Sequence, residues 1–457
     1  MISAGLFSSI LFFVIAIGVL VTFHEFGHYW VARKLNVKVL RFSIGFGKPL
    51  LTVRRRHGDD EIEYVIAAIP LGGYVKMLDE REAPVELHNK HRAFNNQPIL
   101  KRAAIVAAGP IFNFILAIFL YWIVLLNGED GRRPVIFPAE NSLAMQAGFS
   151  TEDEILAVGT VAVTTWQAFR LELIDQGIDG GKLPIQVRTA KNELLTHVLN
   201  IGERHLLAKQ DDVTDQLGFS LWQPVLEPVI GDLEDHGAAQ RAGLQRHDKI
   251  LAVDGDATAE WPDVVKHIQA GANQTLMFSI ERNGVKQDVN IIPNVRSQNG
   301  KSVGYIGAGL YVPEEIINKL TVHIDYTVFD AASNALAKTW SSSQLILRVL
   351  GKMLLGEASL ENISGPITIA TYAGISASIS LVTYLGFLAI ISVSLGVLNL
   401  LPVPMLDGGH LLYYLIEVVK GSPVSDKFEE IAQQVGLAIL LMLMVVAMYN
   451  DIQRLLN

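Results

Sequence analysis

Cysteine is absent from this chain of 457 residues, and charged residues make up only 18% of it. The absence of cysteine excludes disulfide bonds, but it identifies no compartment, since an exported domain can lack them. The net charge of −9 argues against a nucleic-acid partner. Half of the residues are apolar and the mean hydropathy is +0.32, which is too high for an ordinary soluble protein of this length. The composition therefore favours a membrane protein.

Long apolar runs without charge agree with the composition. A spanning helix needs about 20 mainly apolar residues, and four stretches of the chain qualify. The first has no basic segment before it and no small-residue cleavage site, so we expect it to be an anchor and not a cleaved signal peptide. The four expected spans are residues 4–23, residues 103–126, part of the region 362–406, and residues 431–450.

The distribution of charge predicts the orientation. Residues 33–102 contain 14 Lys or Arg, whereas nothing basic precedes the first span. The positive-inside rule therefore places residues 33–102 in the cytoplasm and the N-terminus outside. Residues 127–315 then lie outside, with 27 Asp or Glu against 16 Lys or Arg. With four spans, the C-terminus is outside as well.

A metal-binding pattern, H-E-F-G-H, occupies residues 24–28 at the end of the first apolar run. His24 and His28 are four residues apart and so share one face of a helix. Glu25 between them is placed to activate a water, as H-E-x-x-H motifs do. Ionisable groups at membrane depth are costly and are usually functional, although a chance match is the alternative. We expect a metal site here.

A catalytic zinc site takes three protein ligands, so one more is needed. The third apolar region ends in N-L-L-P-V-P-M-L-D-G-G-H, residues 399–410. Pro402 and Pro404 cannot continue a helix, and Asp407 follows the break. Irregular backbone at this depth is tolerated only where it lines an enclosed or wet site. Asp407 is therefore the expected third ligand, the alternative being an aspartate that caps the next helix.

The outer region contains a repeat with an offset of 95 residues. The pattern A-G-[LF]-x-x-x-D-x-I-L-A-V begins at Ala147 and again at Ala242, and a Trp follows each copy at the same distance. Each copy predicts a short helix, a turn with Asp, a buried strand and a second helix. The pattern resembles the start of circularly permuted PDZ domains, and residues 217–219 and 306–308 resemble their carboxylate-binding loops. Two copies of another small αβ unit are the alternative.

Two further segments have recognisable periodicity. Residues 325–355 have apolar side chains at helical spacing beside basic ones, which indicates amphipathic helices at a membrane surface, or else a soluble helix that faces a core. Residues 41–47, and residues 61–68 followed by 71–77, are rich in β-branched and aromatic residues with Gly punctuation, which is typical of strands.

These motifs resemble the site-2 protease family of intramembrane zinc metalloproteases over nearly the whole chain. The H-E-x-x-H of the first span and the N-x-x-P-x-P-x-x-D-G that starts at Asn399 are complete, and residues 109–113 match the family's G-P-x-x-N. The resemblance implies one zinc ion held by His24, His28 and Asp407, with Glu25 as general base. It also implies that Asn399 positions substrate, for which an amide that packs between helices is the alternative.

The same resemblance assigns the β-rich segments to a membrane-dipping loop and to a strand that clamps unwound substrate. An added strand would satisfy the backbone groups that unwinding frees. A cytoplasmic hairpin with a structural role is the alternative. The substrate-binding residues implied in this way are Gly45, Gly47, Tyr74, Val75, Lys76 and Met77.

The partners implied by the resemblance are the lipid bilayer and a single-span membrane protein, such as an anti-sigma factor already trimmed outside, with remnant signal peptides as a further class. Peptide C-termini would bind at the PDZ-like domains, or these domains would exclude bulky substrates. The implied location is the bacterial inner membrane, with the PDZ-like domains and both termini in the periplasm and the active site towards the cytoplasm. A zincin with a cytosolic catalytic domain does not fit, because residues 33–102 are too short for one. A scaffold with a structural metal would need a fourth protein ligand.

We therefore expect a polytopic α-helical membrane protein with four transmembrane helices, a small membrane-associated β element and two α+β PDZ-like domains outside. The expected segments are a first span with the metal motif (1–32), a cytoplasmic β segment (33–102), a second span (103–126), PDZ-like domains (127–222 and 223–312), amphipathic helices (313–375), a third span with the proline motif (376–410) and a fourth span region (411–457).

Overall fold

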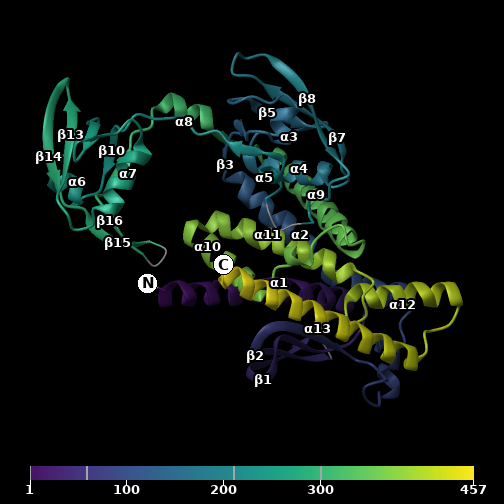
Figure 1. Ribbon diagram of the computed structural model, residues 1–457. Coiled ribbons are helices and arrows are strands. Elements are labelled where there is room, and N and C mark those ends of the chain that lie inside the picture. The colour runs from purple at the N-terminus through teal and green to yellow at the C-terminus, as the bar shows by residue number, and fades with distance from the viewer. Residues whose placement is uncertain (1, 58–59, 209–211, 299–300, 457) are drawn as a thin grey trace.

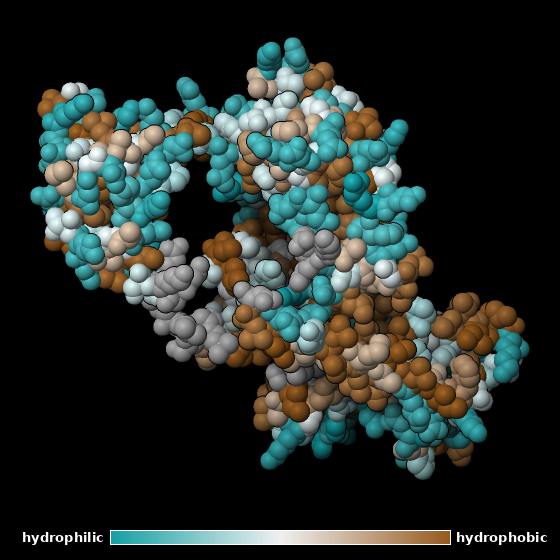
Figure 2. Space-filling view, in the orientation of Figure 1, coloured by the Kyte–Doolittle hydropathy of each residue, from teal (hydrophilic) through white to brown (hydrophobic). Residues whose placement is uncertain are grey.

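The computed structural model describes residues 2–57, 60–208, 212–298 and 301–456. Figure 1 shows a central group of helices, with two αβ units on one side of it and a long β-hairpin on the other. The apolar surface gathers over the helices, whereas the αβ units are largely hydrophilic (Figure 2). This arrangement fits a protein whose central layer lies in a membrane.

Within the described residues, four helices are long and apolar enough to cross a membrane, as the sequence predicts. Three of them, Phe7–Lys34, Ile99–Leu126 and Leu381–Leu400, share a core with small residues such as Ala16 and Ala117 beside Leu20, Leu116 and Leu388, so these helices approach closely. The helices of this layer are α1 (Ile2–Lys34), α2 (Ile99–Leu126), α10 (Pro366–Ile379), α11 (Leu381–Leu400), α12 (Asp407–Lys420) and α13 (Asp426–Leu456), and the four candidate spans are Phe7–Lys34, Ile99–Leu126, Leu381–Leu400 and Lys427–Leu456.

The chain breaks after α11, where the prolines predict a turn. α11 ends at Leu400, and Asp407 is the first residue of α12. Between them Met405 has a φ of 84°, a left-handed conformation that is uncommon for a residue with a side chain. A Cβ on Gly408 would lie 2.2 Å from the carbonyl oxygen of Leu401. The tight turn therefore needs glycine directly after Asp407.

The hairpin of β1 (Val39–His57) and β2 (Asp60–Met77) forms a sheet of four segments, because both strands bend. The first part of β1 pairs on one side with the end of β2 and on the other with its beginning, as the pairs Ser43↔Tyr74 and Ser43↔Val65 show. The beginning of β2 also pairs with the end of β1. The end of β2 is consequently an edge of this sheet within the described residues.

The two outer units have the same construction, as the repeat predicts. Each is a four-stranded antiparallel sheet, in the order β6-β5-β7-β8 or β12-β11-β13-β14, packed on a helix that starts at Trp166 or Trp261. Each has its own hydrophobic core. The first unit comprises β3 (Glu129–Arg132), β4 (Ile136–Pro138), α3 (Leu143–Gln146), β5 (Glu154–Val158), β6 (Val161–Ala162), α4 (Trp166–Gly177), β7 (Gly181–Arg188), β8 (Leu194–Gly202), α5 (Val213–Leu217) and β9 (Phe219–Leu221). The second comprises β10 (Ile230–Leu233), α6 (Ala238–Arg241), β11 (Lys249–Val253), β12 (Asp256–Ala257), α7 (Trp261–Ala270), β13 (Leu276–Arg282), β14 (Val285–Ile291), β15 (Asn294–Gln298), β16 (Lys301–Tyr305) and β17 (Ala308–Leu310).

The segment 313–375 is more varied than a set of amphipathic helices. It contains α8 (Glu314–Leu320), β18 (Thr321–Ile324), which pairs with β3, and α9 (Val328–Leu354). α9 buries Ala331 and Ala335 against the helical layer and exposes a stripe of large apolar side chains. The helix α10 then begins at Pro366, and it is apolar because the chain carries no charged residue from position 362 to 406.

Candidate metal centre and its relatives

Three side chains from distant parts of the chain converge between α1, α2 and α12. Asp407 Oδ2 lies 3.2 Å from His24 Nε2 and 3.6 Å from His28 Nε2, and the two Nε2 atoms are 3.2 Å apart. Tetrahedral zinc ligands lie about 3.3 Å from one another, given bonds of about 2.0 Å. The buried Oδ2 also has no hydrogen-bond donor. The three side chains therefore fit a zinc ion by both spacing and chemistry.

The second nitrogen of His28 shows why its Nε2 is free for a metal. Nδ1 of His28 lies 2.8 Å from the carbonyl oxygen of Ile105, which can only accept, so Nδ1 carries the proton. The two imidazoles lie directly against α2 at Gly109. A Cβ there would come within 2.3 Å of His28 Nε2 and 2.7 Å of a His24 ring carbon. Glycine at position 109 is therefore a requirement of the site.

Asn113 supports the other imidazole from one turn further along α2. It is fully buried, and its side-chain nitrogen lies 3.2 Å from His24 Nδ1. Its Oδ1 is buried without a partner, which costs about 1–3 kcal/mol. If His24 binds a metal through Nε2, its Nδ1 carries the proton and needs an acceptor. Turning the amide over, which changes no heavy-atom position much, then places Oδ1 opposite that proton.

Glu25 faces the edge of the hairpin sheet. Its carboxylate accepts a hydrogen bond from the backbone N–H of Val75. A Cβ on Gly73 would lie 2.9 Å from the Glu25 side chain. Leu78, just after β2, donates its N–H in the opposite direction, to the carbonyl oxygen of Lys38, the residue before β1. Because backbone amides alternate along a strand, those of residues 73, 75 and 77 face the metal centre, and those of Tyr74 and Lys76 face β1.

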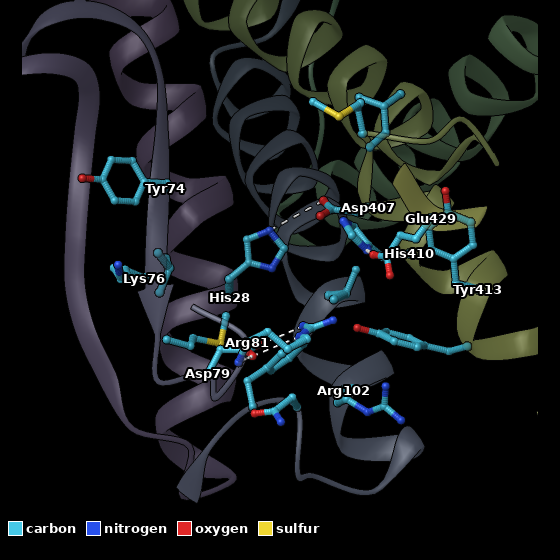
Figure 3. Close-up of a pocket in the computed structure, with 18 of the residues that line it drawn as sticks. His28, Tyr74, Lys76, Asp79, Arg81, Arg102, Asp407, His410, Tyr413 and Glu429 are labelled. Carbon is cyan, nitrogen blue, oxygen red and sulfur yellow. Dashed lines mark hydrogen bonds and ion pairs between the residues drawn. The ribbon is translucent and has the colours of Figure 1, made fainter. Parts of the chain in front are cut away.

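The ligands and Glu25 line a cavity of about 740 Å³. Asn399, on α11, also lines it, as do the edge residues Tyr74 to Met77. Figure 3 shows His28 and Asp407 facing each other across the cavity, with Arg81 and Asp79 paired below them. Burial raises the pKa of Asp79, but its hydrogen bonds with Arg81 outweigh this and hold it below the ordinary value.

A partly buried ion pair fixes the far end of α12 to the start of α2. Arg102 Nη2 lies 2.7 Å from Glu417 Oε1, and the two side chains are only 16% and 13% exposed. The Arg102 guanidinium also lies over the ring of Tyr414, 4.8 Å from its centre. Because α12 begins at Asp407, this pair helps to hold Asp407 in place.

Some predicted site residues lie elsewhere. Gly45 and Gly47, with φ of 90° and 85°, lie at the bend of β1 and do not line the metal cavity. His410, the nearest alternative ligand to Asp407, lines the cavity but lies beside Glu429 at 4.0 Å and outside the three-residue cluster. The substrate-contacting roles of Gly45, Gly47, Asn399 and residues 74–77 stay predictions.

Comparison with known proteins agrees with this geometry. Residues 12–443 match peptidase family M50. This chain belongs to peptidase family M50, the site-2 proteases. It is 43% identical over 449 residues to the regulator of sigma-E protease RseP of Escherichia coli, which covers 97% of this chain and 98% of that protein. It is 41% identical to a putative zinc metalloprotease of Vibrio cholerae and 38% identical to a regulator of sigma E protease of Haemophilus influenzae, with the same coverage. The chain is a zinc metalloprotease by this membership.

Several features of the site were not predicted from the residues. Asn113 was part of a matched motif without an assigned role, and its contact with His24 depends on how α2 packs against α1. The Arg102–Glu417 pair joins residues 315 positions apart, which no local pattern reveals. A polar residue within an apolar span was the available signal for Asn113.

Asn113→Leu is expected to lower zinc affinity by about 10- to 100-fold, as loss of a hydrogen bond to a ligating histidine commonly does. Asn113→Asp is the matched variant and should keep most of the affinity, since a carboxylate accepts from His24 Nδ1. Zinc affinity is measured by competition with a chromogenic chelator in detergent. Equal affinity in the leucine variant and the parent protein would show that Asn113 does not support His24.

Proposed function

We propose that this M50 zinc metalloprotease cleaves single-span membrane proteins within or beside the bilayer. The observation that carries the proposal is the position of the centre. His24 and His28 belong to a helix that can span the membrane, and Asp407 reaches them from the turn after a second such helix. A peptide bond cut there has to lie at membrane depth.

The proposed mechanism assigns each side chain a separate task. When bound by His24, His28 and Asp407, zinc supplies a Lewis acid that polarises the scissile carbonyl and makes water nucleophilic near neutral pH. Glu25 accepts the proton of the attacking water and returns it to the leaving nitrogen. The edge strand holds the unwound substrate beside Glu25, because its free backbone groups satisfy those of the substrate.

The variants Glu25→Gln and Asp407→Ala should distinguish the general base from a zinc ligand. Glu25→Gln is expected to keep about one equivalent of zinc and lose cleavage, because all three ligands remain. Asp407→Ala should lose zinc affinity together with cleavage, whereas His410→Ala, the control in the same cavity, should keep zinc. Metal content and turnover are measured on the same preparations. Loss of zinc from the Glu25→Gln variant would contradict the role of Glu25 as a base. Normal zinc content in Asp407→Ala together with zinc loss in His410→Ala would contradict the assignment of Asp407 as the third ligand.

The direction in which the backbone N–H groups of residues 73–77 point allows a more specific test of the proposed substrate-binding strand. Val75→Pro removes an N–H that faces the metal centre, so it should strongly reduce cleavage while leaving the pairing with β1 and the zinc content intact. Val75→Ala keeps the amide and should be mild. Tyr74→Pro breaks the pairing with β1 instead and should lower the melting temperature. A folded, zinc-loaded Val75→Pro variant that cuts at the parent rate would rule out this edge as the clamp.

We further propose a role in regulating sigma E, with an anti-sigma factor trimmed on its outer side as substrate and the inner membrane as location. The names of the relatives and the basic segment 33–102 support this, as does the position of both αβ units on the side away from the hairpin (Figure 1). Remnant signal peptides are a second substrate class.

The αβ units are proposed to be PDZ-like filters. In the second unit, Ile306 and Ala308 lie beside α7 and line a cavity of about 540 Å³ with Trp261 and Ile268. A peptide C-terminus could occupy this cavity. The chain enters and leaves the unit at adjacent points, since Tyr311 donates its N–H to the carbonyl of Val229 at 2.8 Å.

Removing residues 229–311 with a short linker should therefore leave the metal centre intact, because none of its groups lies in that segment. We expect normal zinc content and cleavage of untrimmed substrates that the full chain rejects. Val265→Asp alone, which places a charge in the same cavity at a partly exposed position of α7 and keeps the bulk of the unit, distinguishes peptide recognition from exclusion by size. A folded deletion variant that still rejects untrimmed substrates would refute the filter.

A further inference from the structure

A second cavity, separate from the metal centre, lies where the end of α1 meets the hairpin. Its volume is about 530 Å³, and it shares no lining residue with the cavity of the metal centre. Two of its lining residues, Arg33 and Arg55, are basic, and the others are aromatic or apolar: Phe26, Tyr29, Phe42, Val53 and Tyr64. It thus combines two guanidinium groups with an aromatic wall.

A chain of hydrogen bonds organises the wall. Arg33 donates to the hydroxyl of Tyr29 at 2.8 Å, and the hydroxyls of Tyr29 and Tyr64 are 2.7 Å apart. Burial and the bond with Tyr29 raise the pKa of Tyr64 to about 12, while Arg33 and Arg55 act in the opposite direction. Both arginines therefore lie near the hydroxyl of Tyr64. Arg33 keeps further N–H groups for another acceptor.

The two faces of the hairpin differ in how their arginines are neutralised. On one face Arg41 and Arg54 both lie 2.7 Å from Glu63. Arg55 points to the other face because side chains alternate along β1. In the part of the chain that the structure describes, neither Arg55 nor Arg33 has a carboxylate within ion-pair distance. Asp60, which interacts electrostatically with Arg33, is already paired with Arg92.

The depth of the cavity is set by α1. Arg33 and Lys34 lie in the last turn of a spanning helix, so they lie among lipid headgroups. Trp30, 45% exposed beneath Lys34, is the aromatic residue expected at such an interface. An open aromatic wall at this depth, next to two unneutralised guanidinium groups, is complementary to a phosphate that carries acyl chains.

We propose that this cavity binds an anionic phospholipid, whose phosphate lies between Arg33 and Arg55 and whose glycerol and upper acyl chain lie against the aromatic wall. The lipid bridges α1 and the hairpin, and so helps to fix the sheet whose far edge faces the metal centre. The binding is independent of the proposed protease substrate and of the orientation in the membrane.

Purified full-length protein in neutral detergent is titrated with fluorescent phosphatidylglycerol, and binding is followed by anisotropy. Arg33→Gln with Arg55→Gln should weaken binding by about 30-fold, since each arginine near an anionic headgroup contributes about fivefold. Arg54→Gln with Arg56→Gln is the matched control, because it removes the same charge from the opposite face and should keep most of the binding. Arg55→Gln alone should show an intermediate loss and guards against misfolding of the double variant.

Two further titrations identify the ligand. Fluorescent phosphatidylcholine should bind much more weakly than phosphatidylglycerol, and glycerol 3-phosphate at the same concentration should not displace the lipid, because it lacks the acyl part. Equal losses in the two double variants would show general electrostatic attraction and overturn the site. Full displacement by glycerol 3-phosphate or inorganic phosphate would instead reveal a site for free phosphate, which also contradicts the proposal.

Discussion

Two imidazole nitrogens and a carboxylate oxygen meet within 3.6 Å of one another, and the packing of the helical layer depends on that meeting. Their free lone pairs are costly in apolar surroundings unless a cation binds them. Glycine occupies the positions where the backbone of neighbouring elements comes close to these side chains or to the turn before Asp407. Gly109 gives α2 room beside both histidines, and Gly408 and Gly409 let the turn close behind Asp407. Gly436 in α13 lies equally close to Pro404, so the last helix is fitted to the same turn.

The edge of the hairpin sheet adds a second constraint, because under the proposed mechanism it sets the direction from which the substrate approaches. Gly73 brings the strand against Glu25, and the amide of Val75 is aimed at the carboxylate. A strand added to that edge has its backbone within reach of the base and beside the ligands. In a membrane, the backbone of an unwound segment has few other partners, so binding and unwinding are linked in one step.

Local patterns predicted much of this protein, and long-range packing accounts for what they missed. The spacing of His24 and His28 predicts a shared helix face, and the paired prolines before Asp407 predict a break, and the structure brings these three side chains together. The strand order of the outer units repeated because the sequence repeats. Asn113, Gly109 and the Arg102–Glu417 pair depend on how α2 lies against α1 and α12, which periodicity does not encode. The varied segment 313–375 was missed because β18 forms only by pairing with β3, nearly 200 residues earlier.

The two outer units are attached to the helical layer in different ways, which bears on how a signal could reach the metal centre. The first unit is held against α9, where Arg348 pairs with Asp175 and Asp179. Hydrogen bonds from Lys352 and Arg348 lower the pKa of Asp179, so these pairs stay charged near neutral pH. The second unit stands apart, with open space between it and the first (Figure 2). Since neither unit lines the metal cavity, both can act on cleavage only by obstructing substrate or by moving α9. The second unit, which stands apart, is placed to obstruct substrate. The first unit, which is ion-paired with α9, is placed to act on the metal centre by moving α9.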